Sequence, residues 1–361
     1  MNLLARLRGA IATGLWAHLP SLTVVAVFFA ASLILLDETD EQVSFDAGIM
    51  AENLLGLLPF FLGGAGILGL IWLVMAPRRE RSLGGALRWF ASRNWLEIVL
   101  LRIPLALGIT TTISYLHLAF KVNIPNFAPY SWDHFFAGID RALFLGQDPW
   151  VLSHQVMPDV LATMIFDMFY MAWFLVMQMS IFAIALLAPR HPLRQTFLLA
   201  YGLNWVVAGA LLAILFPAVG PVYMEGVTGD PMFRPLTGLL SRQGETTQIM
   251  ALEAQRWLWE GYTLADVEPV GISAFPSLHL SIAATCACLG FAASRVTGWL
   301  ATAFTVGILL GSVHLGWHYA IDGIAGIALA LVFWWISARV TRWWLARSEP
   351  ERVGEETVAA Q

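Results

Sequence analysis

Residues 298–341 read GWLATAFTVGILLGSVHLGWHYAIDGIAGIALALVFWWISARVT. Two apolar runs, 298–316 and 317–341, meet at a polar turn that holds His314, His318 and Asp322. Each run is close to the roughly 20 apolar residues that a helix needs to cross the hydrocarbon core of a membrane. The stretch therefore predicts two spanning helices joined in a tight hairpin.

The same kind of apolar run recurs through most of the chain. Of the 361 residues, 58% are hydrophobic and only 12% are charged, about half the charged share of a soluble domain. Runs long enough to span a membrane occur at 20–37, 57–76, 96–120, 160–187, 195–216, 277–294, 298–316 and 317–341. The predicted fold class is an all-α integral membrane protein, and nothing points to a nucleic-acid partner.

The first apolar run resembles a signal peptide because Arg6 and Arg8 precede it. However, no small-residue cleavage site follows the run, and residues 37–41 are mostly acidic. We therefore interpret the run as a retained membrane anchor.

The arginines predict the orientation, because basic residues near short loops resist translocation. With the N-terminus in the cytoplasm, the outer side keeps only Lys121, Arg141, Arg234, Arg242 and Arg256. An even number of spans returns the C-terminus to the cytoplasm, where the arginines of 339–352 lie. We expect a multi-pass protein of the inner (plasma) membrane with both termini cytoplasmic.

Three regions are expected along the chain. Residues 1–95 form an N-terminal two-span extension, 96–341 a six-span core, and 342–361 a polar cytoplasmic tail. The core carries two long outer segments, 121–159 and 217–276, whose tryptophans indicate order.

A capped, helically spaced stretch begins at Ser131 in the first outer segment. Two interpretations of this helix stay open. It lies in the membrane interface, or it packs on the bundle as a cap helix. In the first case the side chains that face lipid are Trp132, Phe135, Phe136, Ile139 and Leu143.

The run Phe275-Pro276-Ser277-Leu278-His279 stands where the second outer segment enters the sixth span. Pro276 suits the first turn of a helix. The free backbone N–H groups of that turn form an anion site that suits a phosphate. The run therefore indicates a phosphate-binding entrance to the span.

His318 and Asp322 are four residues apart, so on a helix they share one face. Such a carboxylate fixes the imidazole tautomer and leaves the other nitrogen free to attack, while a second histidine, His279, protonates the leaving oxygen. Taken alone, the pair is equally compatible with a structural cap. Its occurrence beside His279 at the outer face favours an active site on the periplasmic or extracellular side.

Two other chemistries fit some of these residues. His279, His314 and His318 offer three imidazoles to a metal ion, but few carboxylates accompany them, so we expect neither a metal nor another cofactor. A proton-coupled transporter is a more remote alternative. Inverted repeats and helices broken at mid-span, which transporters commonly show, are not evident in the sequence.

At these residues the chain resembles the type-2 phosphatidate phosphatase superfamily of lipid phosphatases and phosphotransferases. Pro276, Ser277 and His279 match the Pro-Ser-x-His of its second motif, and His318 and Asp322 match the His-x-x-x-Asp of its third. The resemblance covers 96–341 and implies a six-helix core. It also implies that His318 is the nucleophile, that Asp322 orients it and that His279 is the acid.

The chain departs from this superfamily at two places. The Lys-x6-Arg-Pro of the first motif has no match, and 216–223, FPAVGPVY, stands after the fifth span. Gly311-Ser312 replaces the Ser-Arg pair of the third motif. Both departures resemble the branch of inositol phosphorylceramide synthases, as does an early pattern formed by Trp132, Asp133, Asp140, Gly146 and Pro149.

The resemblance implies a lipid phosphotransferase that moves a phospho-headgroup from a phospholipid donor to a lipid or alcohol acceptor through a phosphohistidine. The alternative is a phosphatase acting on phosphatidate or a polyprenyl phosphate. With the basic motifs absent, the expected substrate-binding residues are Ser277, Pro276, Tyr223, Arg234, His314 and Ser312.

Several polar side chains interrupt the apolar runs, among them Asp167, Tyr170 and Asn204. Asp167 either lines the pocket or forms an interhelical hydrogen bond. Cys286 and Cys288 point to different sides of one helix, so we expect packing residues rather than a disulfide or a metal clamp.

Overall fold

The computed structural model describes residues 11–36, 97–264 and 270–347, which form helices and loops without a strand. Five helices are long and apolar enough to cross a membrane, which confirms the predicted all-α membrane fold. They are α7 (Ile103–Val122), α11 (Val160–Ala185), Pro192–Leu215, α18 (Arg295–His314) and α19 (Ala320–Ala346). The third of these comprises α12 (Pro192–Leu203), the π-helical η3 (Asn204–Leu212) and α13 (Ala213–Leu215), and a π-helical turn, η2 (Ile98–Arg102), precedes α7.

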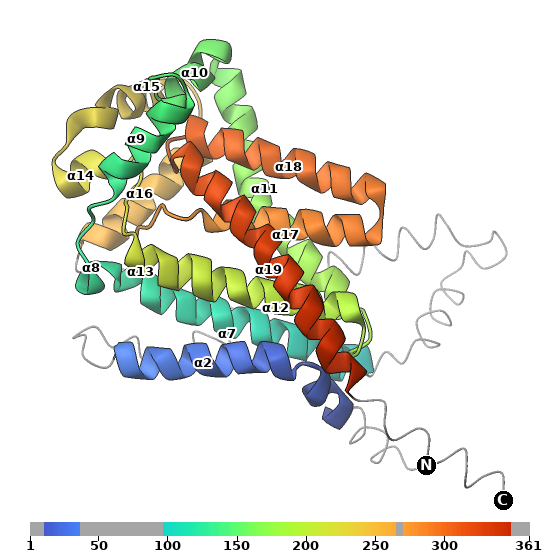
Figure 1. Ribbon diagram of the computed structural model, residues 1–361. Helices are drawn as coiled ribbons and strands as arrows, with labels where there is room; N and C mark the ends of the chain where they lie inside the picture. The colour runs from blue at the N-terminus through green and yellow to red at the C-terminus, as the bar shows by residue number, and fades with distance from the viewer. Residues whose placement is uncertain (1–10, 37–96, 265–269, 348–361) are drawn as a thin grey trace, which may run out of the picture.

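The sixth helix of the core, α17 (Leu278–Ala293), is shorter than the others. Its 16 residues rise about 24 Å, less than the roughly 30 Å hydrocarbon core. It packs against both α18 and α19, and α19 crosses the other long helices obliquely (Figure 1). The expected run 277–294 is therefore a helix of the bundle, although it is too short to span a membrane unless the bilayer is locally thinned.

The N-terminal segment is attached to this core. Helix Ile11–Ala17 and α2 (Leu19–Leu35) meet at an angle of 67°, and α2 packs on α7 and α12. The fully buried Arg194 donates to His18 Nε2 (2.9 Å) and to the carbonyl of Ala185 (2.8 Å). The expected second span, 57–76, lies outside the described residues, so the two-span extension over 1–95 stays a prediction.

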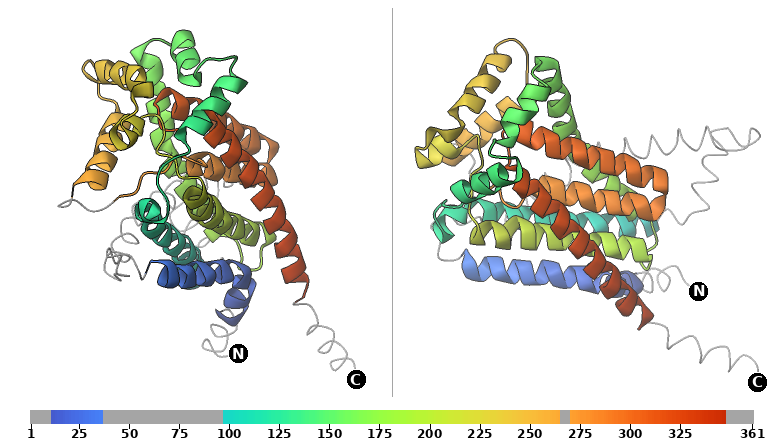
Figure 2. Two further views of the ribbon diagram at one scale, coloured as in Figure 1. Left: turned by 60° about the vertical axis from the view of Figure 1, so that its left-hand side comes forward. Right: turned by 45° about the horizontal axis from the view of Figure 1, so that its top comes forward.

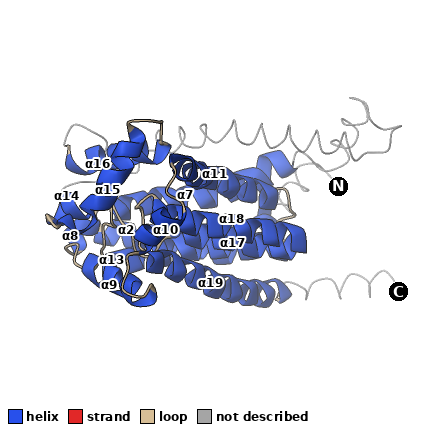
Figure 3. Cartoon of the chain, turned by 90° about the horizontal axis from the view of Figure 1, so that it is seen from above, coloured by secondary structure: helices blue, strands red, loops and turns tan. Residues whose placement is uncertain are grey.

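Short helices cover one end of the bundle (Figures 1, 2 and 3). All of them come from the two segments 121–159 and 217–276, so segments far apart in sequence build one cap. The cap comprises α8 (Ile124–Phe127), α9 (Asp133–Leu143), α10 (Pro149–Val156), α14 (Met224–Thr228), η4 (Pro231–Phe233), α15 (Arg234–Gly244) and α16 (Met250–Thr263).

Helix α9 packs on the bundle. Phe136 is buried and stacks on Phe275 with ring centroids 4.2 Å apart, whereas Phe135 and Leu143 are each 55% exposed. The expectation that Phe136 faces lipid is therefore wrong, because this ring fills the space between α9 and the loop that leads to α17. The cap-helix interpretation describes α9.

Candidate active site

The motif that ends at His279 and the motif formed by His318 and Asp322 meet where α17 crosses α19. A Cβ on Gly326 would collide with the carbonyl of Ser277, so a glycine is needed for this close approach. The backbone N–H of Ser277 donates to the carbonyl of Asp322 at 3.0 Å. The crossing thus places the start of α17 against the first turn of α19.

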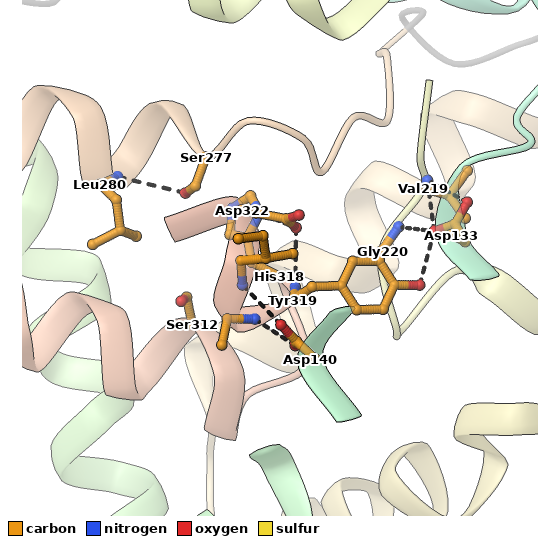
Figure 4. Close-up of polar contacts among 12 residues, drawn as sticks. Asp133, Asp140, Val219, Gly220, Ser277, Leu280, Ser312, His318, Tyr319 and Asp322 are labelled. Carbon is orange, nitrogen blue, oxygen red and sulfur yellow. Dashed lines mark hydrogen bonds and ion pairs between the residues drawn. The ribbon is translucent and has the colours of Figure 1, made fainter. Parts of the chain in front are cut away.

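Ser277 begins α17 as its cap. Its hydroxyl accepts the N–H of Leu280 at 3.5 Å, and its side chain is fully buried (Figure 4). Pro276 therefore precedes the cap, and the expectation that it occupies the first turn is wrong. Leu278 and His279, which do form this turn, line the cavity described below.

His318 and Asp322 face each other at the start of α19 (Figure 4). The His318 Nδ1 lies 3.5 Å from Asp322 Oδ2, and the same oxygen accepts the N–H of Tyr319 at 2.9 Å. Asp322 is fully buried. Because Nδ1 is turned to the carboxylate, Nε2 is the ring nitrogen left for a substrate.

His279 lies in an aromatic slot on the same cavity. Its ring stacks on Tyr170 with centroids 4.6 Å apart and contacts Trp173 at 4.4 Å. The Trp173 indole N–H donates to the His279 carbonyl at 2.9 Å, which fixes the backbone of the first turn. The rings of His279 and His318 are 6.2 Å apart, a separation that leaves room for a reacting group to contact both.

A cavity of about 360 Å³ contains both histidines, within the range of small-molecule sites. Most of its wall is apolar or aromatic. Tyr223 and Pro276, both expected at the site, also line it, and the Tyr223 hydroxyl donates to the Gln255 carbonyl at 3.1 Å. Among the remaining lining residues are Trp205, Ile272 and Trp317.

The cavity reaches the side of the bundle between α7 and α11. Leu118 on α7 and Phe174 on α11 both line it and are 39% and 52% exposed. Both side chains belong to helices that are long and apolar enough to span the membrane. The wall of the cavity therefore includes outward-facing apolar side chains of these two helices.

Four of the expected binding residues do not line this cavity, namely Ser277, which caps α17, Arg234, Ser312 and His314. Arg234 is exposed and pairs with Glu225, with its Nε 3.0 Å from Oε1. The hydroxyl of Ser312 donates to the Leu309 carbonyl. The backbone carbonyl of Ser312 accepts the N–H groups of Trp317 and His318.

His314 is held by two hydroxyl groups. Its Nδ1 and Nε2 are hydrogen bonded to Ser153 (2.7 Å) and Thr163 (2.9 Å), and its ring stacks on His154. The three imidazoles considered for a metal site are thus not assembled. In the described part of the chain, no group of three or more His, Cys, Asp or Glu side chains is placed to hold a metal ion.

Two of the polar residues expected within the spans, Asp167 and Asn204, have structural partners. Asp167 accepts the N–H groups of Met250 and Ala251, both at 2.8 Å, and thereby caps α16 rather than lining the cavity. Asn204 donates to Thr285 on α17 at 3.1 Å. Cys286 and Cys288 are free thiols, as expected.

Two carboxylates of α9 position the site, a role that the sequence did not reveal (Figure 4). Asp133 accepts the N–H of Gly220 (2.8 Å) and the Tyr319 hydroxyl (2.9 Å), and Asp140 accepts the N–H of Ala320 (2.7 Å). Burial raises the pKa of both carboxyls, that of Asp140 to about 6. The early pattern that includes Asp133 and Asp140 drew attention to these residues, but it did not indicate that they position the site.

Lys121 is a further cavity residue that the sequence did not single out. It ends α7 and is the only lysine of the chain. The one signal in the sequence for this position was its expected location on the outer side of the membrane. The local pattern does not show whether the Lys121 side chain points into the cavity.

Comparison with known proteins gives one match. A family model described as PAP2 superfamily matches residues 134–336, which include α9 from its second residue onward and both histidine motifs. Neither the curated proteins nor the solved structures contain a match.

Proposed function

Because the chain belongs to the PAP2 superfamily, whose members are phosphoesterases and phosphotransferases, we propose that it is a membrane lipid phosphotransferase. It moves a phospho-headgroup from a phospholipid donor to an alcohol acceptor. The observation that carries the proposal is His318, backed by Asp322 and paired with His279 on one cavity that reaches the lipid-facing side of the bundle. The alternative within the same chemistry is a lipid phosphate phosphatase.

In the first half of the proposed reaction, Nε2 of His318 attacks the phosphorus of the donor. The bond between phosphorus and the oxygen of the leaving lipid alcohol breaks, and protonated His279 gives that oxygen its proton. Asp322 accepts a hydrogen bond from Nδ1–H and stabilises the positive charge on the phosphorylated ring. The products are a lipid alcohol and a phosphohistidine.

In the second half, the hydroxyl of the acceptor attacks the phosphorus and gives its proton to His279. The bond between phosphorus and Nε2 breaks, so His318 and protonated His279 are both restored. If water attacks instead, the headgroup leaves as a free phosphate ester. Transfer is proposed over hydrolysis because the basic first motif is absent after the fifth expected span and the chain resembles inositol phosphorylceramide synthases there.

Headgroup exchange tests this proposal directly. Purified protein given phosphatidate alone is expected to release little phosphate, because a terminal monoester is a dianion and the cavity holds few cations. With a diester lipid and an alcohol acceptor together, we expect headgroup exchange, measured by mass spectrometry of both lipids. Rapid phosphate release from phosphatidate, with no transfer product for any acceptor, would show a phosphatase instead.

We also propose that the cap and the cavity lie outside the cytoplasm. The connection 186–191 and the end of α19, which carry Arg190, Arg339 and Arg342, lie at the opposite end of the bundle from the cap (Figure 1). Basic residues collect on the cytoplasmic side of membrane proteins, so this asymmetry supports an inner (plasma) membrane protein with an outer active site.

Thiol labelling checks the orientation. In a variant with Cys286 and Cys288 replaced by alanine, Ser241→Cys on the cap should react with an impermeant maleimide in intact cells. His191→Cys, which is exposed at the other end, should react only after the membrane is opened. The reverse labelling pattern would place the chemistry in the cytoplasm.

A further inference from the structure

The cavity contains an unusual balance of charge. Among its lining residues in the described part of the chain, Lys121 is the one lysine or arginine, and no carboxylate accompanies it. The side chain makes no ion pair or hydrogen bond with another described residue. An ammonium group in a largely apolar cavity is costly unless an anion joins it.

The fold fixes Lys121 at the edge of this cavity. A Cβ on Gly271 would collide with the Lys121 carbonyl, so the chain after α16 passes directly over the end of α7. The hydroxyl of Tyr130 holds this passing segment by donating to the Ile272 carbonyl at 2.7 Å. Gly271 and Ile272 also line the cavity, so the end of α7 is built into its wall.

His117 extends this polar wall by one helical turn. It stands four residues before Lys121, so the two share a face of α7, and both line the cavity. Its buried Nδ1 has no hydrogen-bond partner among the described residues, and its ring lies edge-on to Trp205 at 4.9 Å. His117 and Lys121 thus line the same cavity as His279 and His318.

We propose that Lys121 binds the non-bridging oxygens of the donor phosphate, with His117 as a second ligand. This inference rests on the proposed function. It assigns to Lys121 the substrate-binding role that was expected of Arg234. A diester phosphate carries one negative charge, which a single ammonium balances. A monoester dianion would leave a negative charge uncompensated in the apolar cavity, so Lys121 selects a diester lipid.

Three variants test the role of Lys121. Lys121→Met removes the charge and keeps the length, Lys121→Arg keeps the charge, and Arg234→Met removes a cation of the cap that does not line the cavity. In headgroup exchange at a fixed lipid fraction, Lys121→Met should lose about 10- to 100-fold in kcat/KM, as for a hydrogen bond to a charged group. Lys121→Arg should recover part of this loss, and Arg234→Met should stay within about twofold of the wild type.

Inhibitor binding separates this role from a structural one. The probes are a single-chain phosphonate amphiphile with one negative charge and a neutral alcohol of the same chain length. Lys121→Met should weaken inhibition by the phosphonate about 10-fold or more and leave inhibition by the alcohol unchanged. If Lys121→Met fails to fold, the comparison uses Lys121→Gln, which keeps a polar side chain without the charge.

The outcomes for the two proposals are distinct. If the wild type is active and the folded Lys121 variants keep its kcat/KM and its inhibition by the phosphonate, the role of Lys121 is overturned. The proposed function then stands. A wild type that exchanges no headgroup with any diester and acceptor overturns the proposed function itself.

Discussion

Replacing His318 with alanine is expected to lower turnover at least about 1,000-fold, because loss of a nucleophile within a coupled set of residues costs three orders of magnitude or more. The wild type should acquire a base-stable, acid-labile label from a donor lipid labelled at phosphorus, and His318→Ala should not. Headgroup exchange and labelled protein on a denaturing gel measure the two effects.

Two controls separate chemistry from folding. His318 is only 6% exposed, so alanine leaves a gap, and His318→Gln replaces the ring with a side chain of similar size. His314→Gln changes another buried imidazole, one that is bonded to Ser153 and Thr163 and does not line the cavity. More than a few percent of activity in folded His318→Gln would remove His318 from the mechanism.

Asp322→Asn is expected to lower kcat about 100- to 10,000-fold with nearly unchanged KM, the pattern for a carboxylate that orients a catalytic imidazole. Asparagine can still accept the N–H of Tyr319, now 2.9 Å from Oδ2, so α19 keeps this cap. It loses the negative charge that faces His318 Nδ1 and that, in the proposed mechanism, stabilises the phosphorylated ring. Steady-state kinetics on the diester exchange separate kcat from KM.

Asp167→Asn is the matched control for this variant. Asp167 is also a buried carboxylate that accepts backbone N–H groups at a helix start, but it caps α16 and does not line the cavity. We expect a lower melting temperature with little change in kcat. An unchanged kcat in Asp322→Asn would reduce Asp322 to a cap of α19.

The sequence predicted the bundle well because an apolar run of membrane length has few alternatives to a helix. It also paired His318 with Asp322, since residues four apart share a helix face. The same rule failed for His314, which is four residues before His318. Gly316, with φ at 75°, ends α18 between them and turns His314 toward α10 and α11.

The binding residues needed tertiary information. Charge bias along the chain assigned Lys121 and Arg234 to the same side of the membrane, but it does not show which of them turns inward. Asp133 and Asp140 reach partners 86 to 186 residues away, and no local spacing predicts such contacts. The PAP2 superfamily model matches residues 134–336, so Lys121 lies before the matched segment.

The side opening between Leu118 and Phe174 has a consequence for how the enzyme meets its substrates. A donor that enters from lipid is sampled by two-dimensional diffusion, so its effective concentration is its mole fraction in the bilayer rather than its amount per volume. Diluting the donor with inert lipid therefore slows the first half-reaction even when the total donor in the tube is constant. Under the proposed mechanism, the composition of the surrounding membrane, and not the aqueous phase, sets how often His318 is phosphorylated.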